Sequence, residues 1–133
     1  MGSVHPQRGE RGSALIEVLV AASILGIVGL AIAMNAMVAL RFQKTTEVRL
    51  LAKNLAVSKA EELSGVFLDD LDDSFDEVEP NLSVGSHLIQ FSRSTDITVE
   101  ADGSRSVSIS VSSTSPYLTT PVQYTTRFAP WES

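Results

Sequence analysis

The chain has 133 residues, of which 44% are hydrophobic and 20% charged, and its formal net charge is −6. This length holds one small domain, or one small domain with an appendage. The acidic balance argues against nucleic acid as a direct partner, because phosphate binding needs clustered Lys and Arg. The absence of Cys excludes disulfides, thiolate zinc sites and cysteine nucleophiles.

A short polar segment, residues 1–12, precedes a long apolar run at Val18–Leu40 that contains no charged residue. About 20 apolar residues span the hydrocarbon core of a bilayer as a helix, so the run predicts one membrane-spanning helix. A buried core helix is the alternative, but a chain of this length could hardly surround such a helix on every side. Four residues interrupt the run: Ser23, Gly26, Gly29 and Asn35.

The helical pattern continues beyond the apolar run. Residues 41–67 contain no Pro, and their first Gly is Gly65. Apolar residues recur between charged ones at close to a 3.6-residue period, which predicts an amphipathic second half with one stripe to bury. We expect one helix from Ala14 to Ser64, with Gly65 as its stop. The predicted stripe consists of Val48, Leu51, Leu55 and Leu63, with the small Ala52 beside it.

An acidic stretch follows the helix, and we predict a connecting loop at Asp69–Val84 with room for a short helical turn. Calcium binds carboxylate oxygens, but the EF-hand template fails here, because Phe75 stands where Gly is needed and Asn81 where Glu is needed. A solvated acidic loop without metal or cofactor is the favoured interpretation. The alternative is a different kind of calcium site, built from Asp69, Asp70, Asp72, Asp73 or Asp76.

After Gly85 the pattern changes to alternation of polar and apolar residues, which is typical of strands. The dipeptide Asp102-Gly103 predicts a hairpin turn, which Ser104 lengthens. One face of an antiparallel sheet needs an apolar cover, and the helix stripe is the candidate, so the class is α+β. The predicted strands are His87–Arg93, Asp96–Ala101, Arg105–Ser112 and Val122–Phe128.

Nothing in the pattern indicates catalysis, so we predict that the chain is not an enzyme. The serines of residues 104–115 alternate with Val and Ile as strand residues, and no Gly-x-Ser-x-Gly elbow is present. No spacing pairs a nucleophile with a base such as His87. Sheet packing is favoured over partner contact for the three aromatics near loops or strand ends: Tyr117, Tyr124 and Trp131.

Glu17 carries a charge at the entrance of the apolar run, between Ile16 and Val18. A carboxylate within a bilayer costs at least ~2.5 kcal/mol on insertion scales. Such a residue normally has a partner and a function. The alternative is an interfacial Glu that stays in contact with water at the helix end.

The stretch from Arg11 to Ala21, Arg-Gly-Ser-Ala-Leu-Ile-Glu-Val-Leu-Val-Ala, resembles the class III signal of type IV pilins and of the pseudopilins of type II secretion. The resemblance implies that residues 1–12 are a leader and that prepilin peptidase cuts after Gly12. Ser13 then becomes the N-terminus, where the family is N-methylated, and Glu17 is fifth in the mature chain. An ordinary secretory signal has its cut site after the apolar stretch, whereas here the helix stays attached.

Cleavage would free an α-amine at Ser13, which is mostly protonated because its reference pKa is about 7.7–8.0. In a fibre, Glu17 of one subunit can pair with the Ser13 amine of a neighbour. An unpaired buried charge is strongly unfavourable, so the pair favours one axial register. Two departures from major pilins favour a minor subunit: Ser13 replaces the usual Phe, and no Pro lies between Pro6 and Pro80.

The resemblance implies a bacterial inner-membrane protein with one span, a periplasmic C-terminal domain, and later incorporation into a pilus or pseudopilus. Its partners would be other pilin or pseudopilin subunits, prepilin peptidase and membrane lipid. We expect a fibre-core helix at 13–40, an amphipathic half at 41–67 and the exported domain at 68–133. A minor pilin is the favoured role. The alternatives are a minor pseudopilin of a type II secretion or DNA-uptake machine, or a membrane-anchored periplasmic binding module.

Overall fold

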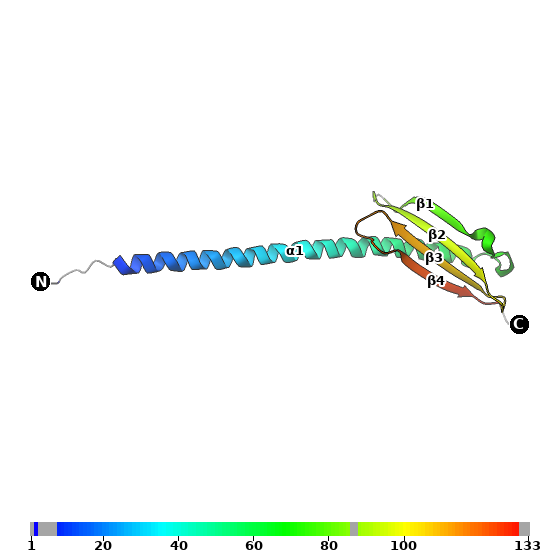
Figure 1. The fold of residues 1–133 in the computed structure, drawn as a ribbon, viewed down its shortest axis with the longest axis horizontal. Coiled ribbons are helices and arrows are strands. Elements are labelled where there is room, and N and C mark those ends of the chain that lie inside the picture. The colour runs from blue at the N-terminus through cyan, green and yellow to red at the C-terminus, as the bar shows by residue number, and fades with distance from the viewer. Residues whose placement is uncertain (1, 3–7, 86–87, 131–133) are drawn as a thin grey trace. The chain divides into compact units, whose positions relative to one another are not determined.

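The computed structural model describes residue 2, residues 8–85 and residues 88–130. It confirms the predicted α+β class, since a long N-terminal helix packs against an antiparallel sheet that has four strands in the described residues (Figure 1). The elements in chain order are α1 (Arg8–Ser64), the 3-10 turns η1 (Leu68–Asp70) and η2 (Asp73–Phe75), and the strands β1 (Glu77–Ser83), β2 (Gln90–Val99), β3 (Arg105–Ser113) and β4 (Val122–Phe128).

Helix α1 has 57 residues and ends at Ser64, as predicted from Gly65. Its last turn tightens, because the Gly65 N–H donates to the Glu62 carbonyl at 3.2 Å and the Val66 N–H donates to the Leu63 carbonyl at 3.1 Å. Such bonds satisfy carbonyls that a helix end leaves unpaired. The chain divides into two compact units, Met1–Arg41 and Phe42–Ser133, and α1 contributes a segment to each.

In the second unit, α1 buries a line of mainly small residues against the sheet. The helix packs on the face that the predicted stripe marks, but the most buried residues of that face are not all the predicted ones. Leu51 and Leu55 are only partly buried, while alanines occupy the positions of full burial. Small side chains therefore make up most of the buried line, and the partly buried Leu51 and Leu55 pack beside it. The buried line is Val48, Ala52, Ala56, Ala60 and Leu63.

The sheet supplies the other half of the core. β2 and β3 pair without a register shift from Phe91↔Ser113 to Val99↔Arg105. Alternate residues of both strands are buried in the core. The positions between them hold serines in β3 and Ser92, Ser94, Asp96 and Thr98 in β2. The strand prediction for Val122–Phe128 is confirmed, and β4 pairs along its whole length with β3. The buried apolar residues of these strands are Phe91, Ile97, Val107, Ile109 and Val111.

Two parts of the strand prediction are wrong. The separate strands expected at His87–Arg93 and Asp96–Ala101 are one strand, β2, because Ser94 and Thr95 continue the alternation and pair with Ser110 and Ile109. His87 itself lies outside the described residues. The expected loop at Asp69–Val84 contains β1, preceded by the two short turns η1 and η2.

Strand β1 escapes a pattern search because it is irregular. It contains Pro80, and Asn81 has φ 60. The pairing register with β2 shifts between Glu79 and Leu82, so Pro80 and Asn81 form a bulge. Most of β1 is exposed, with only Glu79 and Leu82 half-buried. A strand with little apolar burial and no regular alternation gives no period-2 signal.

The turn at Asp102-Gly103 is confirmed, and Ser104 lengthens it as expected. Gly103 has φ 81, a conformation that Gly adopts without steric cost. The Asp102 carboxylate accepts from the Ser104 N–H at 3.0 Å and from its hydroxyl at 2.6 Å, and these bonds lower the pKa of Asp102. Arg127 of β4 pairs with Asp102 and donates through Nε to the Ser104 hydroxyl at 2.8 Å.

Candidate processing and assembly site

The predicted site residues Gly12, Ser13 and Glu17 lie on α1 near its start at Arg8, and all three are exposed. The helix is therefore formed across the expected cut between Gly12 and Ser13. Gly9 and Gly12 each cost roughly 1 kcal/mol relative to Ala within a helix. These two glycines therefore lower the helix propensity of the first turns of α1.

Gly12 has no structural reason to be glycine within this chain. A Cβ at Gly12 would meet nothing within 4 Å, and its φ is not positive. The same holds for Gly9, Gly26 and Gly29 of α1. Packing within the chain therefore does not account for the glycine at position 12.

Ser13 and Glu17 are four residues apart on α1, so they lie on the same side of the helix, one turn apart. None of the ion pairs among the described residues involves Glu17. Among the described residues, the Glu17 carboxylate therefore has no ion-pair partner, and a cationic group of another molecule could pair with it.

The apolar run beyond Glu17 is uncovered on all sides. Its large side chains have between 49% and 72% of their surface exposed, Val28 and Leu25 being the two extremes. Ser23, a polar residue within the run, donates its hydroxyl to the Leu19 carbonyl at 2.7 Å, so its hydroxyl donor is satisfied without water. Within the described ranges, α1 is the one helix long and apolar enough to cross a membrane.

The acidic candidates for calcium do not converge. In the described part of the chain, no group of three or more His, Cys, Asp or Glu side chains is arranged to hold a metal ion. Asp72 caps η2, because its carboxylate accepts from the Ser74 N–H at 2.9 Å. Asp76 accepts from the Ile97 N–H at 2.7 Å. Asp69 and Asp70 lie on η1, and Asp73 begins η2.

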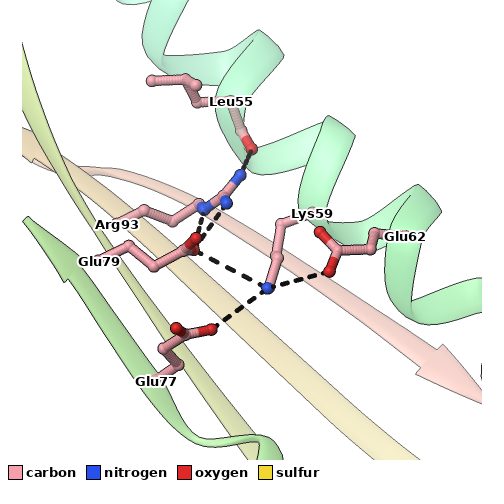
Figure 2. A network of polar contacts seen from close by, with 6 residues as sticks. All are labelled: Leu55, Lys59, Glu62, Glu77, Glu79 and Arg93. Carbon is pink, nitrogen blue, oxygen red and sulfur yellow. Dashed lines mark hydrogen bonds and ion pairs between the residues drawn. The ribbon is translucent and has the colours of Figure 1, made fainter. Parts of the chain in front are cut away.

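Arg93 belongs to a polar cluster that sequence reasoning missed, between the sheet and the second half of α1. Its side chain is on the core face of β2, and the residue is 7% exposed. Nε and Nη2 each lie 2.6 Å from Oε2 of Glu79, and Nη1 donates to the Leu55 carbonyl at 2.9 Å (Figure 2). A buried guanidinium needs such partners, and these partners join β1, β2 and α1.

Lys59 of α1 lies beside Arg93 and is 6% exposed. Its Nζ is 3.4 Å from Glu62 Oε1, 3.4 Å from Glu77 Oε2 and 3.9 Å from Glu79 Oε2, as Figure 2 shows. Glu62 and Glu77 are largely exposed, so their contacts with Lys59 contribute little. Glu79 is the least exposed of the three carboxylates, and it links Lys59 of α1 to Arg93 of β2. Because β1 was not predicted, nothing in the local pattern indicated that Glu79 would face two cations.

A groove of about 470 Å³ lies where α1 ends and β4 ends. Phe67 at its rim is largely exposed, whereas Tyr124 packs against the core as predicted. Trp131 lies outside the described residues. The apolar lining of the groove comes mainly from Leu63, Val66, Phe67, Leu71, Phe128 and Pro130.

Comparison with protein families gives one match, to the family described as Prokaryotic N-terminal methylation motif, at residues 7–33. The matched segment contains Gly12, Ser13 and Glu17 and the first part of the apolar run. No curated protein and no solved structure matches the chain. The match supports the type IV pilin and pseudopilin family, whose members are structural proteins that assemble with other pilin subunits.

Proposed function

We propose that the chain is a minor pilin-like structural subunit of a type IV pilus or a related filament. In this proposal, prepilin peptidase cuts after Gly12, and the subunit assembles through its apolar helix. It uses no cofactor and has no active site of its own. Before assembly it is held in the inner membrane by α1, with the sheet domain on the periplasmic side.

The observation that carries the proposal is the arrangement of the N-terminal segment. Gly12 lacks an internal packing role, Glu17 is exposed one turn beyond Ser13, and the following apolar side chains are uncovered. The match to the methylation motif covers this arrangement. A helix that is apolar all round must be covered by lipid or by other helices. When the subunit leaves the bilayer, the helices of neighbouring subunits in the fibre replace the lipid.

The pairing of Glu17 with the α-amine of Ser13 from a neighbour gives the assembly its register. Both groups leave water when helices pack in a fibre core, and each alone would be strongly unfavourable there. A subunit shifted along the fibre axis would leave both charges unpaired. Methylation of Ser13 keeps the amine cationic, so it leaves this pairing intact.

The mature N-terminus gives the most direct test. Mass spectrometry of the membrane-bound protein should find a chain that starts at Ser13, with or without one methyl group. The Gly12→Leu variant should retain its leader, because a bulky side chain blocks the protease at that bond. An intact Met1 in the unmodified protein, or a cut after Leu40, would refute the proposal.

Glu17 separates a filament subunit from a simple tether. For a subunit, Glu17→Leu should be processed normally yet enter filaments at least about tenfold less, the result of one unpaired amine. The Ser23→Leu variant is the control, since it makes the same helix more apolar without removing a charge. For a membrane-anchored binding module, Glu17→Leu should be harmless or should improve insertion.

The groove lined by Phe67 and Phe128 favours the binding module as the second candidate, because apolar concave surfaces are common ligand sites. Phe67→Ser should then abolish ligand binding by the module while leaving membrane insertion unchanged.

Which assembly contains the subunit, a pilus or a secretion or DNA-uptake machine, is tested by deletion. Deletion strains with normal filament number and length would contradict a tip-initiating minor subunit. Loss of secretion or DNA uptake with intact pili would favour a minor pseudopilin.

A further inference from the structure

Asn35 is a second strongly polar side chain in the apolar part of α1, after Glu17. Its carboxamide is exposed, and within the described ranges it makes no hydrogen bond. Ser23 differs, because its hydroxyl donates to the Leu19 carbonyl of the same helix. A carboxamide has two donors and an acceptor, and an unpaired one away from water is unfavourable. Asn35 therefore needs a partner from outside its own helix.

The position of Asn35 in the apolar run indicates where that partner comes from. Asn35 lies six residues before Arg41, the first charged residue after the run, which is about 9 Å along a helix. When Arg41 lies at the membrane surface, Asn35 lies within the hydrocarbon. Its side chain is too short to reach the headgroups as Lys and Arg do. Lipid tails offer no hydrogen-bonding group, so the partner is another protein segment that crosses the bilayer.

Asn35 and Glu17 lie on one face of α1. They are 18 residues apart, which is about five full turns of a helix, so their side chains leave the helix in the same direction. The positions between them follow steps of four and three residues, the spacing by which two helices interdigitate. This seam is exposed along its length. It consists of Glu17, Ala21, Ile24, Val28, Ala31, Asn35 and Val38.

A second copy of this chain meets the condition that Asn35 sets. Copies anchored in one membrane run in the same direction and hold Asn35 at the same depth. Because a carboxamide is both donor and acceptor, two Asn35 side chains can hydrogen-bond to each other across a parallel pair of helices. One Asn in an otherwise apolar seam specifies the register and the number of helices. The small Ala21 and Ala31 let the two backbones approach closely.

We propose that two copies of the chain pair in the bilayer through this seam, in parallel and in register, with Asn35 against Asn35. The pair is a membrane-held state that precedes assembly. This inference rests on the part of the proposed function that holds the chain in the membrane. It goes beyond that function by naming a partner, a helix face and the residue that fixes the register.

Glu17 sets a further condition on the pair. In register, two Glu17 carboxylates come together at one end of the seam, and like charges repel. Removal of the leader frees an α-amine at Ser13 of each copy, one turn from Glu17. These two cations offset the two carboxylates. The pair therefore forms from the processed chain rather than from its precursor.

The absence of Cys from the chain makes disulfide cross-linking a direct test. Ala31→Cys places a thiol on the seam. Ala33→Cys is the matched control, because position 33 lies about 200° further round the helix. Each full-length variant is expressed in cells that hold prepilin peptidase and no other prepilin-type protein, and the isolated membranes are oxidised. Ala31→Cys should give at least about fivefold more product with the mass of two mature chains.

Substitutions within the Ala31→Cys chain separate the Asn35 amide from apolar contact. Asn35→Leu should lower the yield at least about threefold, the effect of one lost hydrogen bond between membrane helices, although it makes the seam more apolar. Ser23→Leu should leave the yield unchanged, because the Ser23 hydroxyl is already bonded to Leu19 and lies off the seam. Gly12→Leu, which keeps the leader, should lower the yield because Glu17 then has no amine to offset it.

Four results overturn the proposal: equal yields from the two cysteine positions, no product from either, a product with another protein, or an unchanged yield with Asn35→Leu or Gly12→Leu. Entry into filaments is measured separately, in cells that hold the complete machinery. A processed chain that enters filaments without forming the pair overturns only this inference. A chain that keeps residues 1–12 and enters no filament overturns the proposed function, whatever its cross-linking.

Discussion

The Arg11–Arg41 part of α1 exposes its large aliphatic side chains, whereas the Phe42–Ser64 part buries mainly alanines. Leu25 in the first part is 72% exposed, and Leu63 in the second is 1% exposed. The first part is apolar all round and has no cover within its unit. The second is amphipathic and is covered by the chain's own sheet.

The difference shows that the size of an apolar side chain in this one helix depends on what covers it. A side chain that meets lipid or a neighbouring subunit gains from being large, because transfer energy grows with apolar area. A side chain beneath a sheet must instead fit the space that the sheet leaves, which holds Ala52, Ala56 and Ala60 in the middle of the line. Four substitutions test this comparison, in order of expected effect.

The same truncation should destabilise the sheet domain in one part of α1 and leave its stability nearly unchanged in the other. Leu63→Ala should lower the free energy of unfolding of the sheet domain by about 2–5 kcal/mol, because it leaves a cavity in a packed core. Leu25→Ala should change it by less than about 0.5 kcal/mol. Urea unfolding of the full chain in detergent measures both. Equal losses would contradict the division of α1 into two differently covered parts.

Removal of Glu79 tests the polar cluster. Glu79→Gln leaves Arg93 without its carboxylate and Lys59 with only exposed partners, so the domain should lose roughly 2–3 kcal/mol. Glu61→Gln, at an exposed position of α1, is the control and should have little effect. The same unfolding measurement applies. A neutral Glu79→Gln would mean that β1 is held by its backbone pairing alone.

Enlarging an alanine in the buried line tests the close approach of the sheet. Ala56→Leu should destabilise the domain by about 1–3 kcal/mol, because the added methyl groups force β2 and β3 away from α1. Ser58→Leu adds similar bulk at an exposed position and should be tolerated. If both variants have wild-type stability, the alanines are not a packing requirement.

The smallest effect concerns Asp72. The Ser74 hydroxyl, followed by the Ser74 N–H, lowers the pKa of Asp72 below 3.8. A lowered folded-state pKa stabilises the fold above about pH 4 and loses that contribution as pH falls through the folded value. Ser74→Ala should therefore raise the pKa of Asp72 toward 3.8 in an NMR titration. The pKa of Asp102, held down by Ser104, should stay unchanged as the internal control.

The sequence predicted helix α1 and strands β3 and β4 from their regular patterns, whereas β2, although regular, was predicted as two strands. Helix α1 ends where Gly65 indicated, and Val122–Phe128 matches β4 to the residue. The candidate site could be named because Gly12 and Glu17 form part of a contiguous motif, which the family match at 7–33 covers. Their roles in cleavage and assembly remain predictions.

Features that depend on distant residues could not be predicted. Strand β1 depends on its pairing with β2 and on the ion pairs of Glu79. Glu79 contacts Arg93, 14 residues away on β2, and Lys59 on α1. The alanine centre of the core is another such feature, because the choice between Ala52 and Leu51 depends on how closely the sheet lies. Local periodicity contains no information about which distant residues β1 contacts or how the sheet packs on α1.

The bulge in β1 sets the phase of everything on that strand. Glu79 and Leu82 are three positions apart, so a regular strand would turn them to opposite faces. Both are half-buried, because the extra residue opposite β2 restores Leu82 to the helix side. A deletion of Asn81 would leave Glu79 and Leu82 two positions apart, which places both on the helix side of a regular strand. The bulge therefore adds one residue to β1 without changing the face that Glu79 and Leu82 occupy.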